Sequence, residues 1–434
     1  MTARSPFPIC RVGVLLCLLA CGTAARAESL LARTGVEAHG FIDARAGART
    51  QPDPNERDMS LGEVRLQLDL ERMGDLTTLQ FKTDLLYDDI PDDKDPDLEE
   101  GTGPVDLRVL SLLVSPTDWL DVRLGRQPLT WGVGDLLFIN DLFPKDWRSF
   151  FSGRDEEYLK APSDALFLSL YPGFADINVA YTPRFDSDRY INGDRISYWN
   201  PMLGAAAGRD AVIDPVARED WFADDELAVR LRRNVKGYDL AAYIYDGFWK
   251  NPVGLDPVAM RPCFPGLSVY GASLNGRLGK GILSLALGYY DSKDDSDGDD
   301  PFVPNDELRG LIGYQRELLK NFSATVQFYV EAMQDHAAYE AGLPPGAKPA
   351  DEYRQVATLR LMKQALNQDL MLSLFVYWSP TDKDGYARPI ATYKLTDAWK
   401  LTAGGNLFWG EEDHTFFGQF AKNSNLYGGL RYSF

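Results

Sequence analysis

Residues 61–89 read "LGEVRLQLDLERMGDLTTLQFKTDLLYDD", and this stretch decides the fold class. Apolar residues at the even positions of 64–70 alternate with charged and amide residues, and the alternation resumes over 79–85 after the turn "MGDL". Side chains alternate faces along a strand, so this hairpin has one apolar face and one charged face. A soluble β-sandwich and a membrane barrel with a watery lumen both fit it.

The N-terminus has the pattern of a secretory signal peptide over 1–27, which leaves 28–434 as the mature barrel domain. Arg4 and Arg11 precede the short apolar run 12–20, and the small-x-small site "ARA" follows. The apolar run is too short to span a bilayer. An earlier cut before Cys21, with lipidation of that cysteine, is the alternative.

The mature chain is strongly acidic. Cleavage after residue 27 removes three arginines and no acid, so the net charge of −19 becomes −22. Nucleic acid is excluded as a partner because phosphate binding requires a basic surface. Cys263 is the cysteine that remains after this cleavage, so the chain forms no internal disulfide.

The rest of the chain alternates short turns with long polar loops, and no later apolar run is long enough for a membrane helix. Such alternation is typical of outer-membrane barrels, with turns on the periplasmic side and loops outside. We therefore predict an all-β protein, a transmembrane antiparallel up-and-down β-barrel of about 18 strands, with 131–163 and 184–223 as the longest loops. Aromatic residues near strand ends are expected to form interfacial girdles, namely Trp119, Trp249, Trp378, Trp399, Trp409, Tyr87, Tyr171 and Tyr245.

The C-terminal residues "NLYGGLRYSF" choose between sandwich and barrel. Leu430, Tyr432 and Phe434 lie on one face, and the terminal aromatic residue resembles the C-terminal signal of bacterial outer-membrane barrels. The resemblance implies the outer membrane as location and recognition by the barrel-assembly machinery.

Motifs for catalysis are not recognisable in this sequence. His39, His336 and His414 have no catalytic or metal-ligand spacing, so we expect no enzyme, although a Ser–His pair on the outer wall is an alternative. No cofactor is expected. The acidic loops 88–101 and 291–307 are expected to bind divalent cations at most incidentally, or to bridge to lipopolysaccharide phosphates through them.

Charged residues at lumen-facing positions are candidates for contact with a solute. The inward arginines are Arg45, Arg65, Arg123, Arg230, Arg232, Arg360 and Arg431. They alternate on this face with the acids Glu37, Asp43, Glu63, Asp69, Asp121 and Glu226. Each either braces the wall in an ion pair or faces the solute, and the sequence leaves both possibilities open.

The 131–163 loop is rich in aromatic residues, which are costly to expose on a cell surface. It is therefore expected to fold into the barrel mouth or to pack over the rim. In the first case its charged residues limit the conducting path, with Asp135, Asp141, Lys145 and Arg148 as the constriction candidates.

The segment "LGRQPLTWG" at 124–132 resembles the strand-end motif of the alginate-export family of outer-membrane barrels, at positions Gly125, Arg126, Gln127, Trp131 and Gly132. The resemblance implies an eighteen-stranded barrel that passes an anionic polysaccharide or another hydrophilic solute. We therefore expect a channel or exporter for hydrophilic, charged or saccharide solutes. The alternative is a conduit that houses a periplasmic partner, such as an export component or an electron-carrying cytochrome.

Overall fold

The computed structural model describes residues 34–434 except 93 and 345–346, so the predicted signal peptide and Cys21 lie outside the described residues. Over the described residues, eighteen strands form one sheet. These are β1 (Val36–Arg49), β2 (Met59–Met73), β3 (Thr77–Asp88), β4 (Val105–Thr117), β5 (Leu120–Pro128), β6 (Pro162–Leu170), β7 (Asp176–Thr182), β10 (Glu226–Val235), β11 (Tyr238–Phe248), β14 (Gly266–Leu278), β15 (Gly281–Ser292), β16 (Glu307–Leu319), β17 (Phe322–Met333), β18 (Tyr353–Ala365), β19 (Leu370–Ser379), β20 (Asp384–Lys394), β21 (Trp399–Gly410) and β22 (Asn425–Ser433).

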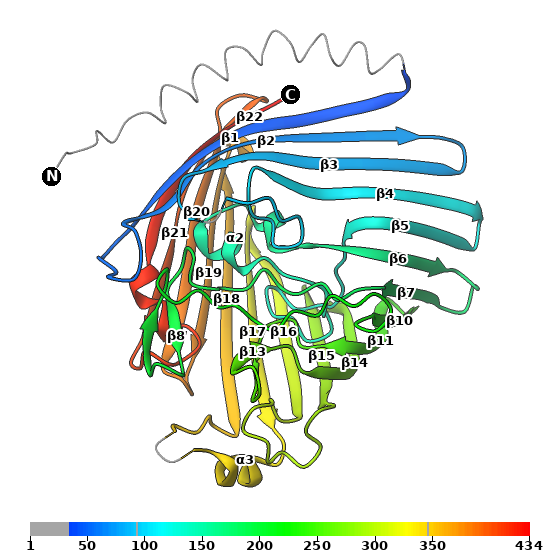
Figure 1. The fold of residues 1–434 in the computed structure, drawn as a ribbon. Coiled ribbons are helices and arrows are strands. Elements are labelled where there is room, and N and C mark those ends of the chain that lie inside the picture. The colour runs from blue at the N-terminus through cyan, green and yellow to red at the C-terminus, as the bar shows by residue number, and fades with distance from the viewer. Residues whose placement is uncertain (1–33, 93, 345–346) are drawn as a thin grey trace, which may run out of the picture.

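The sheet closes on itself, which confirms the predicted barrel. Every strand pairs antiparallel with its neighbour in the chain, and β22 pairs antiparallel with β1, beside which it lies in Figure 1. At the seam, the backbone groups of Gly40 and Phe434 exchange two hydrogen bonds of 3.0 Å. Closure leaves no unpaired strand edge, the condition a sheet must meet in a bilayer.

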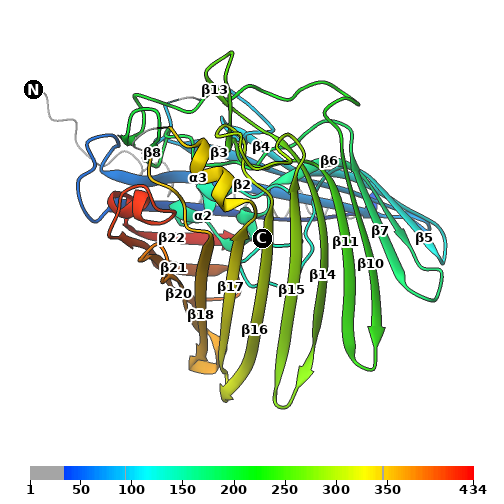
Figure 2. The ribbon, with the colours of Figure 1, turned by 90° about the horizontal axis from the view of Figure 1, so that it is seen from below.

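Short turns lie at one end of the barrel and longer connections at the other (Figure 2). The small hairpins β8 (Tyr198–Asn200) with β9 (Ala205–Ala207), and β12 (Gly254–Asp256) with β13 (Arg261–Cys263), belong to the long connections, as does α3 (His336–Gly342). Among the described residues, no helix is long and apolar enough to cross a membrane.

The two faces of the wall have opposite chemistry. Leu124 is 58% exposed and Ile312 53% exposed on the outer face, whereas Arg65 and Asp84 are buried inside. Exposed leucine and isoleucine with buried charge invert the pattern of a water-soluble protein, and they match a wall between lipid and a polar lumen.

The predicted aromatic girdles are only partly present. Trp119, Trp378 and Tyr87 are exposed on the barrel, but Trp249 and Tyr245 are buried, so their assignment to a girdle was wrong. Tyr245 alternates along β11 with the exposed Ile244, so its ring faces the lumen, where its hydroxyl donates a hydrogen bond to Glu226.

Candidate functional site

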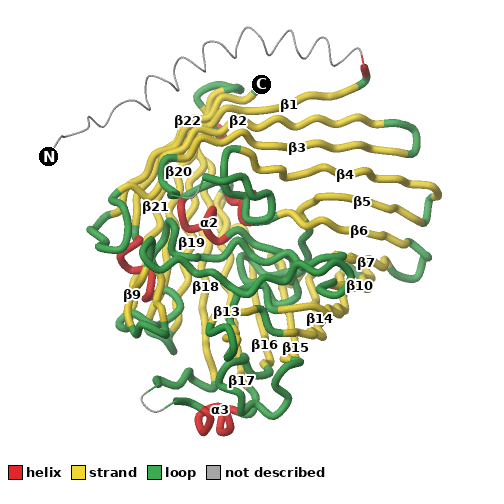
Figure 3. Tube along the Cα trace, viewed as in Figure 1, coloured by secondary structure: helices red, strands yellow, loops and turns green. Residues whose placement is uncertain are grey.

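The connection between β5 and β6, residues 129–161, lies inside the curve of the sheet with its helix α2 (Trp147–Ser152) (Figure 3). We call it the lumen loop. Two glycines with positive φ lie at its beginning, Gly125 near the end of β5 with a φ of 111° and Gly132 in the loop itself with a φ of 92°. A Cβ on Gly125 would collide with the backbone carbonyl of Leu110, so only glycine fits at this position.

The other residues of the 124–132 motif anchor this segment. Arg126 pairs with Asp164 at 2.8 Å, and Gln127 donates to the carbonyl of Ala165 at 3.1 Å. Trp131 packs edge-on against Phe143, with ring centroids 4.9 Å apart. The motif therefore ties the end of β5 to β6 and to the beginning of the lumen loop.

The backbone of residues 135–140 forms hydrogen bonds with side chains on the wall strands β15, β17 and β19. Asp135 exchanges two hydrogen bonds with the side chain of Gln327 on β17, at 2.7 and 2.8 Å. Tyr377 on β19 donates to the carbonyl of Leu136, and Tyr290 on β15 donates to that of Ile139. These bonds satisfy polar backbone groups that would otherwise be buried without a partner.

The helix α2 fastens the loop to a third part of the wall by aromatic packing. Phe150 and Phe151 are 1% and 3% exposed. Phe151 lies 5.3 Å from the ring of Tyr386 on β20 and 5.1 Å from that of Phe408 on β21. Asp146 caps the helix by accepting from the backbone N–H of Ser149, so its start is defined locally. The predicted aromatic cluster therefore packs inside the barrel.

Charged residues attach the returning segment to the barrel seam. Asp155 accepts from Arg45 on β1 at 2.5 Å and from Arg431 on β22 at 2.7 Å. Although burial opposes its ionisation, these two arginines hold the pKa of Asp155 well below its usual range. The carboxylate is thus charged at neutral pH and bridges the first and last strands.

Tyr158, at the end of the lumen loop, contacts the wall strands β2 and β3. Its hydroxyl donates to Asp84 at 2.8 Å, and the Arg65 guanidinium lies 4.2 Å over its ring. Burial raises the pKa of Tyr158, so it stays a neutral donor. The lumen loop therefore contacts the wall around most of the barrel's circumference.

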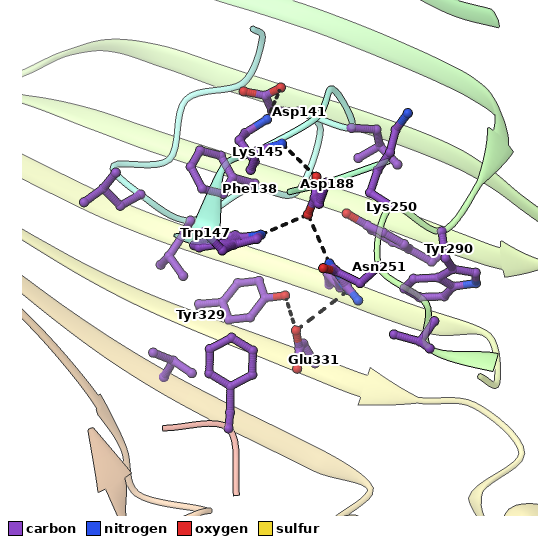
Figure 4. Close-up of a pocket in the computed structure, with 18 of the residues that line it drawn as sticks. Phe138, Asp141, Lys145, Trp147, Asp188, Lys250, Asn251, Tyr290, Tyr329 and Glu331 are labelled. Atoms are coloured by element: carbon purple, nitrogen blue, oxygen red, sulfur yellow. Dashed lines mark hydrogen bonds and ion pairs between the residues drawn. The ribbon is translucent and has the colours of Figure 1, made fainter. Parts of the chain in front are cut away.

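A second long connection, residues 183–225, packs on the lumen loop. Asp188 accepts from the backbone N–H of Lys145 at 2.7 Å and from the indole of Trp147 at 2.9 Å (Figure 4). Arg189 pairs with Asp106 on β4 at 2.9 Å and with Asp146 at 3.4 Å. The two longest predicted loops therefore pack against each other.

The residues predicted for the constriction fall into two groups. In the first group, Arg360 on β18 pairs with Asp135 of the lumen loop at 2.7 Å. Arg65 on β2 pairs with Asp84 on the neighbouring strand β3 and lies over the ring of Tyr158 in the same loop. Arg230 and Arg232 lie apart from them on β10, bound to Asn178 and Asp176, and Arg123 lies half-buried on β5.

The two cations of the lumen loop that were predicted for the constriction are less exposed to solvent than a residue that contacts a passing ion must be. Lys145 is 3% exposed and is held by Asp141 at 3.0 Å. Arg148 pairs with Glu100 at 3.0 Å. Lys145 therefore has a structural role within the loop, and its charge is largely neutralised by its partner.

Sequence reasoning missed the acidic run at the end of the lumen loop. Glu156 and Glu157 are about half exposed and face Arg360 at 3.2 Å and Arg431 at 3.8 Å. The signal was the run "RDEEY" itself, whose charge is opposite to that of the inward arginines. Arg388 on β20, buried against the ring of Phe150, was also missed.

A cavity of about 330 Å³ lies between the lumen loop, the 183–225 connection and the wall strands β15 to β19. Figure 4 shows Asp188 joined by hydrogen bonds to the backbone N–H of Lys145 and to the side chains of Trp147 and Asn251. Among the described residues, no group of three or more His, Cys, Asp or Glu side chains is placed to hold a metal ion. Incidental cation binding at the acidic loops stays a prediction.

The geometry can be compared with known proteins. No protein-family model and no curated protein matches the sequence. Among solved structures, OccAB4 of Acinetobacter baumannii is 10% identical, with a TM-score of 0.55 over 92% of this chain and 98% of that chain. OccAB3 of the same organism is 11% identical, with a TM-score of 0.52 over 92% and 99%. The outer membrane channel DcaP, also from Acinetobacter baumannii, is 12% identical, with a TM-score of 0.42 over 92% and 97%.

Likeness at this level of identity concerns the fold. The closed eighteen-stranded barrel, with its apolar outer face and charged lumen, defines an outer-membrane protein of the porin type. Its location is the bacterial outer membrane. The resemblance of residues 124–132 to the alginate-export family stays a prediction, because no family model matches.

Proposed function

We propose that this protein is an outer-membrane channel for small hydrophilic solutes, including charged ones and saccharides, and that the lumen loop sets the width of its path. The observation that carries the proposal is the attachment of this loop around the inner wall, from Gln327 on β17 to Asp84 on β3. An unobstructed barrel of about eighteen strands is wide enough for an aqueous channel, so a loop inside it determines what passes.

Charges of both signs on the inner wall support hydrophilic solutes over lipids. Arg360, Glu156 and Arg431 are partly exposed near the loop, so a passing solute meets hydrogen-bonding groups rather than an apolar surface. The strong fixation of the loop also suits a narrow path for small molecules.

Single-channel recording in a planar bilayer tests this proposal. Replacing residues 135–159 by a short Gly-Ser linker should raise conductance several-fold, because the obstruction is removed while the strands remain. A matched control removes α3, residues 336–342, from another connection and should leave conductance near that of the wild type. Unchanged conductance in the folded lumen-loop variant would refute the proposal.

The conduit alternative receives no support from the contacts of the lumen loop. A folded partner inside the barrel would have to displace the ion pairs of Asp155 and the aromatic packing of Phe151. Breaking several buried interactions together is costly, so the loop and an enclosed partner compete for the same space.

A further inference from the structure

We propose that the 330 Å³ cavity in Figure 4 is a binding site for a small, uncharged aromatic molecule that carries a hydrogen-bond-accepting oxygen. The binding itself needs no conduction. Its expected consequence, a lower current while the ligand is bound, rests on the proposed channel function, because part of the cavity lining is the lumen loop.

The size and lining of the cavity suit a one- or two-ring molecule. Its volume is at the small end of the range for ligand pockets, roughly 300–1,000 Å³. Aromatic rings form much of the lining, among them Phe138, Trp147, Trp249, Tyr290, Tyr329 and Tyr377. At the rim, Val253 is 50% exposed and Phe416 46% exposed, so the cavity opens toward the loop end of the barrel.

The charged groups of the lining already have partners within the protein. Four cations each hold an acid, in the pairs Lys145–Asp141 at 3.0 Å, Lys250–Glu226 at 2.5 Å, Arg309–Glu307 at 2.6 Å and Arg354–Glu331 at 3.1 Å. Both oxygens of Asp188 accept hydrogen bonds, from the backbone of Lys145, the indole of Trp147 and the amide of Asn251. An ionised ligand would have to break one of these pairs, so the site favours an uncharged one.

One polar group of the lining, the indole N–H of Trp249, differs from the charged groups in its hydrogen bonding. The indole Nε1 of Trp249 is buried without a hydrogen-bond partner among the described residues, and the whole side chain is 9% exposed. An indole nitrogen can only donate, so its complement is an accepting oxygen. A buried donor without a partner is unfavourable, and a ligand oxygen would relieve that cost.

The surroundings of Trp249 also select a flat ligand. Its ring lies 5.8 Å from that of Tyr290 at an interplanar angle of 33°, and the planar guanidinium of Arg309 lies 3.9 Å above Tyr290. Rings and guanidinium planes in such a cluster favour a further planar group by stacking. A saturated ring of the same size would fill the space without that contact.

The test uses the full-length protein in detergent micelles and isothermal titration calorimetry, with protein-free micelles subtracted. The probe is acetophenone, a flat ring with an accepting oxygen. Ethylbenzene lacks the oxygen, cyclohexyl methyl ketone lacks the flat ring, and benzoate carries a charge. Acetophenone should bind saturably and at least five-fold more tightly than each of the other three.

Two variants locate the site. Trp249→Phe keeps the ring but removes the donor and should weaken acetophenone binding at least five-fold, whereas Trp409→Phe, on an exposed ring, should leave binding unchanged. If Trp249→Phe does not fold, Val253→Trp at the exposed rim should narrow the entrance and weaken binding. Equal binding by wild type and the folded variants would mean partition into the micelle and would overturn the site, as would tighter binding of benzoate or ethylbenzene.

The failures of the two proposals are distinguishable. Acetophenone binding without any channel activity would keep the site and refute the channel. A conducting barrel that shows no saturable binding would keep the channel and refute the site.

Discussion

Arg360 on β18 and Asp135 in the lumen loop form an ion pair of 2.7 Å although 225 positions separate them in the sequence. Burial raises the pKa of Asp135, and the arginine opposes that shift. Arg360 also holds Glu156 at 3.2 Å, so one wall residue fastens both the outgoing and the returning parts of the loop.

Loss of this double contact should loosen the lumen loop. We expect Arg360→Gln to lower the free energy of unfolding by about 2 kcal/mol, because two carboxylates lose a partly buried partner. Single-channel records should show a noisier and higher current. Arg232→Gln, at an exposed pair with Asp176, is the control and should change stability by less than about 1 kcal/mol. Equal effects of the two variants in urea titrations would contradict this role of Arg360.

The exposed acids of the loop should govern ion selectivity. Glu156 and Glu157 have side chains that are 47% and 55% exposed, so we expect Glu156→Gln with Glu157→Gln to move the reversal potential toward anion preference. Neutralising the buried Lys145 should shift selectivity much less, because Asp141 already compensates its charge. Reversal potentials in a salt gradient measure both. A larger shift from Lys145 would place the narrowest point elsewhere in the loop.

Asp186, in the 183–225 connection, should make stability depend on pH. Burial raises the pKa of Asp186 to about 7; Lys250 opposes the shift, and the nearby carboxyl groups of Glu226 and Asp164 add to it. An unfolded aspartate titrates near about 4, so between about pH 4 and 7 only the folded state holds the proton. Stability should therefore fall as pH rises through this window. Asp186→Asn should flatten that fall in thermal unfolding midpoints, and an unchanged slope would contradict the assignment.

The outer wall should reject charge while the inner wall tolerates it. Ile312, 53% exposed on β16, faces outward, and we expect Ile312→Arg to cost about 2–4 kcal/mol if it lies near the middle of the bilayer. Ser284→Arg is the matched control, because Ser284 pairs with Gly313, the residue next to Ile312, and faces the lumen. Folding yield can be read from heat-modifiable migration on gels. Similar damage from both changes would argue against the two faces.

The last residue should be needed to close the barrel. Phe434 exchanges two backbone hydrogen bonds with Gly40, and a Cβ on Gly40 would approach the Phe434 ring to 2.7 Å. Deletion of Phe434 removes these contacts and the terminal aromatic of the predicted assembly signal, so folded barrel should become scarce in the outer membrane. Phe434→Tyr should retain most of it, and full assembly after deletion would refute the signal.

Much of the fold was predictable because a strand's alternation is a local property. The hairpin of residues 61–89 carried its own assignment of faces, and the structure forms it from β2 and β3. The strand count followed from turns that can be read one at a time. The two girdle assignments that failed, Trp249 and Tyr245, rested on position near a strand end alone. Tyr245 alternates along β11 with the exposed Ile244 and therefore points inward, and Trp249 is buried beyond the end of that strand.

The sequence by itself determined a closed barrel with an apolar outside and a charged inside, because that outcome depends on a period of two residues and on paired edges. Only the tertiary structure decided which charges meet. Closure of the barrel brings Arg45 and Arg431 to the same carboxylate of Asp155, and it buries Lys145 beside Asp141. Such contacts depend on the path of a loop across the lumen, and that path results from packing against many strands at once, which no local pattern encodes.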